Sequence, residues 1–263
     1  PIMCDFDFGE PFPFEMRPIF KETMQTDQHG KKAIYADDSF RQNFRADTDP
    51  SAKNMLAGWA QRAVISAAPS DHSLEERSLV DVAAEQGKDP IDLALDMSID
   101  SDFAARFRVP LVNFDHEEVR ELLGDDNTVV ALSDAGAHAS QLCDACYSTH
   151  LLGHWSRDEG AMEMEKAVHM LTQKPADLMG ITDRGLLAQG RPADVVLFDP
   201  EVVGATGLTR VYDQPAGQDR LVAQAKGIQA VIVNGTVIRE DNKDAVSPGE
   251  ALPGQMLRGG KAV

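Results

Sequence analysis

The clearest hydrophobic pattern in the chain is a run of four apolar residues, Val129-Val130-Ala131-Leu132, flanked by Thr128 and by Ser133-Asp134. Consecutive apolar residues rich in β-branches are typical of a strand that is buried on both faces, as in a parallel sheet. The Ala135-Gly136-Ala137-His138 segment then turns the chain. The pattern predicts a strand over residues 128–134 that ends at Asp134.

Three helices are predicted upstream, over residues 73–86, 90–97 and 115–123. The first begins with a capping box, in which Ser73 is the N-cap and Glu76 stands three residues later, and it stops at Gly87. The second begins at Asp89-Pro90, with proline at its first helical position. The third is capped by Asp115 and ends at Gly124.

Other segments give weaker signals. The first 70 residues look irregular, residues 37–49 are polar with little pattern, and residues 59–66 fit either a strand or a short helix. Downstream, residues 141–156 are expected to be partly helical. Residues 162–171 predict an amphipathic helix, and residues 175–179 a short one that closes at Gly180.

The pattern of hydrophobic and polar residues changes between residues 180 and 190, from an α/β type before to a β type after. Residues 193–200 read as a strand, and residues 228–238 as a β-hairpin around Asn234-Gly235, the strongest short hairpin signal. The last residues carry Pro-Gly pairs and read as an extended tail. We therefore predict two domains, an α/β domain over residues 1–185 and a β domain with its tail over residues 186–263.

Composition excludes some classes of protein. The chain has 263 residues, 43% of them hydrophobic and 26% charged, with a net charge of −18. Such an acidic chain is repelled by nucleic acid and by anionic membranes. No apolar run approaches the roughly 20 residues of a membrane helix, and three cysteines do not make a disulfide framework. A cytoplasmic location is expected.

The chain starts at Pro1 without an initiator Met, so we expect a piece of a longer protein.

Asp134 is the first candidate for chemistry because the C-terminal ends of parallel strands are where α/β folds place catalytic groups. A carboxylate there can bind a metal or accept a proton from metal-bound water. The plainer alternative is an Asp that caps the following turn. His138 can face the same site across Gly136, or it can be a loop histidine bonded to backbone.

Other motifs give weaker evidence of a functional site. Cys143 and Cys146 form a single CxxC, which we interpret as two structural thiols because zinc ribbons need two such pairs. His150 and His154 stand four residues apart, but Leu151 occupies the position where HExxH requires Glu, so ordinary core or surface histidines are favoured. His116 is expected to be exposed. No GxGxxG, P-loop or GxSxG motif occurs, which argues against nucleotide binding and serine hydrolysis.

The ordered set of motifs resembles the D-aminoacylase branch of the amidohydrolase superfamily. Residues 132–138 (LSDAGAH) resemble its final barrel strand and residues 171–176 (LTQKPA) the helix that follows. Residues 183–199 resemble its G-x-x-x-x-G-x-x-A-D-h-h-h-h-D segment, where h is apolar, and residues 227–235 its closing hairpin. The resemblance covers about residues 125–258. It implies α/β plus β architecture: the C-terminal part of a (β/α)8 barrel followed by part of a small β-sandwich.

The resemblance also implies a mechanism, the hydrolysis of the amide bond of N-acyl-D-amino acids with one or two zinc ions. Asp134 matches the residue that binds metal and acts as general base and acid, and His138 is a candidate substrate contact. Residues before 125 resemble the excursion that precedes the last strand. Trp59, Arg62 and Ser66 are substrate-binding candidates there, with Arg62 placed to pair with a substrate carboxylate.

The chain departs from the family pattern because it has no HxH; no two of its histidines stand two residues apart. The other metal ligands are expected upstream of Pro1, in a missing N-terminal barrel portion or in another chain. We therefore expect a partial barrel without a complete metal site. Two alternatives stay open: a hydantoinase- or dihydroorotase-like cyclic amidohydrolase, and a non-catalytic subunit or scaffold that completes a barrel with another chain.

Overall fold

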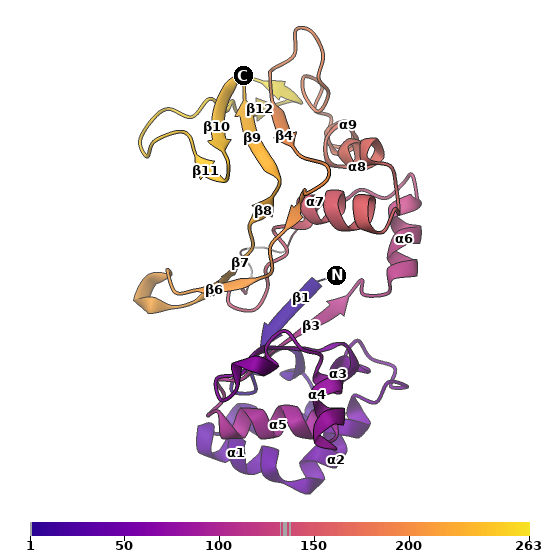
Figure 1. Ribbon diagram of the computed structural model, residues 1–263, viewed down its shortest axis with the longest axis vertical. Coiled ribbons are helices and arrows are strands. Elements are labelled where there is room, and N and C mark those ends of the chain that lie inside the picture. Colours follow the sequence, from indigo (N-terminus) through magenta and orange to yellow (C-terminus); the bar gives the residue numbers. More distant parts are fainter. Residues whose placement is uncertain (1, 132, 134–135, 137) are drawn as a thin grey trace. The chain divides into compact units, whose positions relative to one another are not determined.

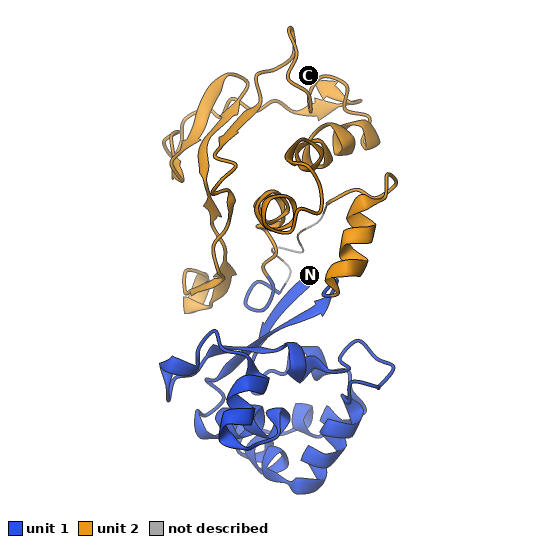
Figure 2. Ribbon diagram, turned by 45° about the vertical axis from the view of Figure 1, so that its right-hand side comes forward, with its two compact units in different colours: residues 1–114, 137–142 blue, residues 115–136, 143–263 orange. Residues whose placement is uncertain are grey.

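The computed structural model describes residues 2–131, 133, 136 and 138–263, which fall into two compact units (Figures 1 and 2). Unit 1 comprises Pro1–Phe114 and Ala137–Leu142, and unit 2 comprises Asp115–Gly136 and Cys143–Val263. The domain boundary expected between residues 185 and 186 lies inside unit 2 and stays a prediction about domain organisation.

Unit 1 combines a three-stranded antiparallel sheet of order β1-β3-β2 with five α-helices. Its strands are β1 (Ile2–Phe6), β2 (Val64–Ala67) and β3 (Arg106–Val112). Its α-helices are α1 (Gln28–Ala36), α2 (Asp38–Asp47), α3 (Trp59–Arg62), α4 (Leu79–Gln86) and α5 (Pro90–Asp100). Short 3-10 helices are η1 (Phe12–Phe14), η2 (Pro18–Phe20), η3 (Thr23–Gln25) and η4 (His72–Leu74).

An aromatic cluster forms the core of unit 1. Phe6, Phe8 and Phe14 pack edge-to-face on Trp59, with ring centroids 5.2–6.1 Å apart, and all four side chains are fully buried. Such pairs add about 0.5–1.5 kcal/mol each beyond the burial of their area. Strand β1, the Pro-rich segment after it and helix α3 are therefore joined by one hydrophobic core.

The strands of unit 1 correct one expectation. The chain was expected to supply part of a (β/α)8 barrel, but β1 and β2 both pair with β3 in antiparallel register. A (β/α)8 barrel is built from parallel strands. Arg106 favours the antiparallel pairing, because its guanidinium donates to Asp5 at 2.8 Å and to Asp7 at 2.7 Å on the neighbouring segment. No barrel closure is seen among the described residues, and the architecture is mixed α/β.

The helix starts and stops in unit 1 were partly predicted. Asp89 caps α5 by accepting from the Ile91 N–H, and Gly87 ends α4 with φ +65°. The capping box at Ser73–Glu76 was wrong, since Glu76 has φ +61° and α4 begins only at Leu79. Residues 37–49, expected to be weakly structured, contain α2, whose first turn is capped by Asp37. Residues 59–66 contain both a short helix and the start of a strand.

Unit 2 contains helices, a π-helix and short strands. The helices are α6 (His116–Gly124), α7 (Tyr147–His150), the π-helix η5 (Leu151–Asp158), α8 (Met164–Leu171), α9 (Gln173–Leu178) and the 3-10 turn η6 (Pro215–Gly217). The strands are β4 (Val195–Phe198), β5 (Gly204–Ala205), β6 (Thr209–Val211), β7 (Arg220–Val222), β8 (Ala225–Lys226), β9 (Ile228–Val233), β10 (Thr236–Glu240), β11 (Lys243–Asp244), β12 (Leu257–Arg258) and β13 (Lys261–Ala262).

The largest sheet of unit 2 has the order β11-β10-β9-β4, so β4 is an edge strand. Its β9–β10 hairpin turns at Asn234-Gly235, with φ +47° and +80°, as predicted from the Asn-Gly pair. Of the strand expected over residues 128–134, the described residues 128–131 and 133 belong to no strand. An apolar β-branched run becomes a strand only where a neighbour supplies ladder hydrogen bonds, and none pairs with it in the described part of the chain.

None of the helices in the described ranges combines the length and the apolar character needed to cross a lipid bilayer.

Candidate functional site

Asp134, the predicted catalytic and metal-binding residue, lies outside the described residues. Its role therefore stays a prediction from the sequence.

His138 is exposed and lies in unit 1. Its backbone has φ +47°, and its carbonyl oxygen accepts from the N–H groups of Gln141 and Leu142 at 2.7 and 2.9 Å. The imidazole packs on the ring of Phe12, with centroids 4.6 Å apart. The exposed histidine is thus held against an aromatic ring.

Arg62, the predicted partner of a substrate carboxylate, closes helix α3. Its guanidinium lies over the ring of Phe114 at 3.9 Å, and Nη1 donates to the carbonyl oxygens of Ala57 and Gly58. Burial lowers the pKa of Arg62 from its ordinary value. Among the described residues no carboxylate pairs with this cation, and its buried Nε has no hydrogen-bond partner.

Two further polar atoms near Arg62 lack partners. Ser66 Oγ on β2 and Trp59 Nε1 on α3 are buried without a hydrogen bond in the described structure. Buried polar atoms are nearly always bonded, so three atoms without a partner within residues 59–66 are unusual. The structure brings Arg62, Ser66 and Trp59 onto adjacent elements, but no described hydrogen bond, ion pair or ring contact joins them to His138.

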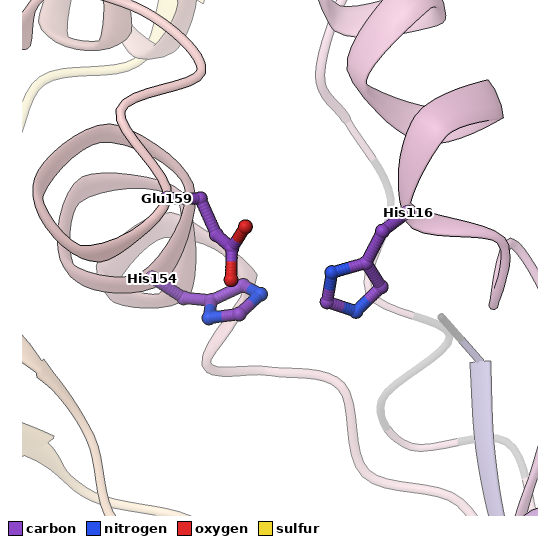
Figure 3. Close-up of side chains that lie close together, drawn as sticks. All are labelled: His116, His154 and Glu159. Atoms are coloured by element: carbon purple, nitrogen blue, oxygen red, sulfur yellow. The ribbon is translucent and has the colours of Figure 1, made fainter.

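A cluster that the sequence did not reveal lies in unit 2. His116, His154 and Glu159 each offer a ligand atom, and these atoms lie within 4.8 Å of one another. Figure 3 shows the three side chains converging, His116 from the start of α6 and the other two from the π-helix and its end. His150 stacks on His154, with ring centroids 4.6 Å apart and an interplanar angle of 20°.

Burial sets the electrostatics of these histidines. It lowers the pKa of His150 to about 4 and also lowers that of His154. The sequence showed the spacing of His150 and His154, but neither the nearness of His116 nor the π-helical turn that brings Glu159 close. The only local signal was two histidines and an acid within ten residues.

Cys4, Cys143 and Cys146 are free in the described structure, and the structural role of Cys143 and Cys146 stays a prediction. Cys143 is buried and Cys146 half-buried, and burial raises the pKa of the Cys146 thiol. Cys4 is fully buried in the core of unit 1, where burial raises its pKa to about 12. Thiols held protonated in this way are poor nucleophiles and poor metal ligands.

Unit 2 also holds a cavity of about 880 Å³ between its helices and the edge of its largest sheet. Leu152, Val168, Phe198 and Ile228 contribute apolar wall, and Glu165, His169, Arg184 and Asp194 also line it. Arg184 pairs with Asp194 at 3.1 Å, and we assign the cavity no chemistry.

Comparison with known proteins gives the family. Residues 21–239 match the model of the Amidohydrolase family. The D-aminoacylase of Alcaligenes xylosoxydans xylosoxydans is 30% identical over 189 residues, which are 71% of this chain and 35% of that protein. The N-acyl-D-aspartate deacylase of the same organism is 35% identical over 115 residues, 44% of this chain and 20% of that protein.

A crystal structure of D-aminoacylase aligns at 27% identity with a TM-score of 0.44, over 72% of this chain and 37% of that chain. The chain thus spans about a third of the length of the relatives matched over most of it. Because the family match extends over most of its residues, the chain belongs to the amidohydrolase family, with distant homology to D-aminoacylase and N-acyl-D-amino-acid deacylases.

Proposed function

We propose that this chain is part of an enzyme that hydrolyses the amide bond of N-acyl-D-amino acids. The observation that carries the proposal is the family match over residues 21–239, a range that includes Asp134, together with the identity to D-aminoacylase. Arg62 supports it, since no described carboxylate pairs with its guanidinium and an N-acyl amino acid carries a carboxylate that can pair with a guanidinium.

In this proposal Asp134 is the general base and acid. Its carboxylate takes a proton from the water that attacks the amide carbonyl, and it returns that proton to the amine nitrogen as the C–N bond breaks. Arg62 then binds the substrate carboxylate through its guanidinium. Ser66 and His138 contribute hydrogen bonds to the rest of the substrate.

A catalytic zinc centre does not fit the residues of this chain alone. Such a centre needs about three protein ligands, and the sequence offers Asp134 without an HxH. The described cluster of His116, His154 and Glu159 includes neither Asp134 nor His138. We therefore assign no catalytic step to a metal here, and we propose that the remaining ligands come from a polypeptide segment outside this chain.

The decisive experiment measures hydrolysis by the complete enzyme, meaning this chain together with the segment that supplies those ligands. Matched N-acetyl-D- and N-acetyl-L-amino acids and cyclic amides such as hydantoin and dihydroorotate serve as substrates. The proposal expects turnover confined to the D-series. Asp134→Asn should lower kcat by roughly 100- to 10,000-fold, the usual loss of general-base catalysis, and Asp126→Asn is the matched control.

Turnover of cyclic amides alone would instead support a hydantoinase- or dihydroorotase-like enzyme. No turnover by a folded, metal-loaded assembly would support the non-catalytic scaffold. Near-normal kcat in Asp134→Asn would remove that residue from the mechanism and leave the substrate class standing.

A further inference from the structure

We propose that His116, His154 and Glu159 bind a divalent transition-metal ion, with Zn²⁺ the ion whose chemistry fits them best. Two imidazoles and one carboxylate are a donor set that zinc uses in proteins. Their ligand atoms lie within 4.8 Å of one another, and all three residues belong to unit 2.

Local structure explains why the three side chains meet. The Glu159 N–H donates to the His154 carbonyl oxygen at 2.8 Å, a bond that spans five residues as in a π-helix. This wide turn brings the two side chains close at the end of η5. His116 is the first residue of α6, a start fixed by Asp115, whose side chain accepts from the N–H groups of Glu117 and Glu118. The site therefore joins two separate elements (Figure 3).

The distances between the three ligand atoms need to shorten only a little for an ion to bind. A tetrahedral zinc with bonds of about 2.1 Å sets its ligand atoms about 3.4 Å apart. The three atoms must therefore approach by roughly an ångström, which side-chain rotation can supply, because His116 and Glu159 are exposed and His154 is half-buried. Three protein ligands leave the fourth position for a water molecule.

The surroundings orient the ligands. Arg120 donates to Glu159 Oε2 at 3.3 Å, and the second carboxylate oxygen can still bind the ion. His150 stacks on His154, and Trp155 packs at 5.2 Å from the ring of His116 and 5.1 Å from that of His154. Groups that orient metal ligands in this way contribute to affinity, and their loss weakens binding about 10- to 100-fold.

A bound ion would link α6 to the π-helix and so cross-link the chain between residues 116 and 154. A metal ion that binds only the folded state stabilises the fold, and the effect grows with the logarithm of the free metal concentration above Kd. The ligand set contains neither Asp134 nor a cysteine, so the proposal is independent of the proposed amide hydrolysis.

The test uses the 263-residue chain as it stands. Equilibrium dialysis with Zn²⁺ gives stoichiometry and affinity, and Co²⁺ titration reports coordination through its visible absorption. We expect one bound ion per chain and a rise in the unfolding temperature. His116→Gln and His154→Gln should each weaken binding more than about 10-fold, since they remove ligands rather than their outer supports. Glu159→Gln keeps the size of the side chain and removes only the charge, so weaker binding with unchanged folding isolates the ligand role.

Matched controls define what would overturn the proposal. His29→Gln, Asp134→Asn and the double variant Cys143→Ala/Cys146→Ala should bind like the parent chain. Failure of the parent chain to bind Zn²⁺, or a loss of binding in the Asp134 or cysteine variants but not in His116→Gln and His154→Gln, would refute the site. Circular dichroism in the absence of metal separates loss of the ligand from loss of the fold.

Discussion

At the scale of single residues, the Arg62 guanidinium packs on the ring of Phe114 and donates to the carbonyl oxygens of Ala57 and Gly58. An arginine within an apolar stretch suggested a carboxylate partner. The structure adds the packing on Phe114 and the unpartnered Nε, which come from residues distant in sequence or from backbone geometry. Asp134 illustrates the reverse case, because its assignment depends on a motif and not on any described contact.

The role of Arg62 can be tested by substitution in the complete enzyme. Arg62→Ala should raise KM about 10- to 100-fold with little change in kcat, since a hydrogen bond between charged groups contributes about 1.5–3 kcal/mol. Steady-state kinetics measure the split between KM and kcat. Arg77→Ala, which removes an arginine paired with Glu85, is the matched control. A KM unchanged in Arg62→Ala would mean that the side chain only packs on Phe114.

Cys4 makes the stability of the chain depend on alkaline pH. Burial raises its folded-state pKa from 9.0 to about 12, so the folded state holds a proton that the unfolded state releases. The resulting stability is complete below pH 9 and is lost as the pH rises toward 12. Tyr35, buried in the same core, has its pKa raised in the same sense.

Urea unfolding at several pH values between 8 and 11 measures this loss. Cys4→Ala should show a shallower fall in unfolding free energy than the parent chain. Val109→Ala is the control, because Val109 is also fully buried, pairs with Cys4 across β1 and β3, and does not titrate. Equal slopes in the parent chain and Cys4→Ala would contradict the linkage.

At the scale of elements, packing between neighbouring elements determines features that the local sequence pattern does not predict. Gly153 in the π-helix approaches β5 so closely that an added Cβ would lie 2.3 Å from the Val203 carbonyl oxygen. Arg157 donates to that same oxygen, so the backbone cannot easily move away. Gly153→Ala should destabilise the chain by about 1–3 kcal/mol, the usual cost of overpacking.

Chemical denaturation checks this cost. Gly124→Ala is the matched change, because Gly124 ends α6 with open space around it, and alanine there should be neutral or stabilising. If Gly153→Ala proved as stable as Gly124→Ala, the close approach of η5 and β5 would not hold in solution.

Elements with local stop and start signals were predictable. Asp89-Pro90, Asp115 and Asn234-Gly235 fix their own backbone conformations, and the structure confirms them. Helix α2 was missed because its polar residues obscure Phe40 and Phe44, the pair four residues apart that enters the core. The described residues 128–131 and 133 were wrongly predicted as part of a strand because sheet formation depends on distant partners. The cluster of His116, His154 and Glu159 was not predicted either, because His116 lies far from His154 in sequence.

At the scale of the whole molecule, apolar surface is the main feature. Strand β4 lies at the edge of its sheet, and Val196 and Leu197 on it are about half exposed. An exposed apolar edge strand is a template for pairing with another strand. We therefore predict concentration-dependent association of the chain when it is expressed alone.

Sedimentation velocity at increasing concentration measures this association. Val196→Lys should reduce it, because a charge on an edge strand opposes pairing. Leu122→Lys changes a residue of similar exposure on helix α6, where there is no free strand edge, and it should have little effect. A monomeric parent chain at every concentration would contradict the prediction.

The division of the chain into units has a consequence for evolution and engineering. Residues 137–142 belong to unit 1, where the Asp5 N–H donates to the Gln141 carbonyl oxygen, although the segments on both sides of them belong to unit 2. The two units are therefore interleaved along the gene. A single recombination crossover at residue 114 would combine a foreign segment 1–114 with the native hexapeptide 137–142. That hexapeptide was selected to fit the original segment 1–114. Within residues 1–263, homologous exchange of unit 1 requires breakpoints after residues 114, 136 and 142, so the two units are expected to be inherited together.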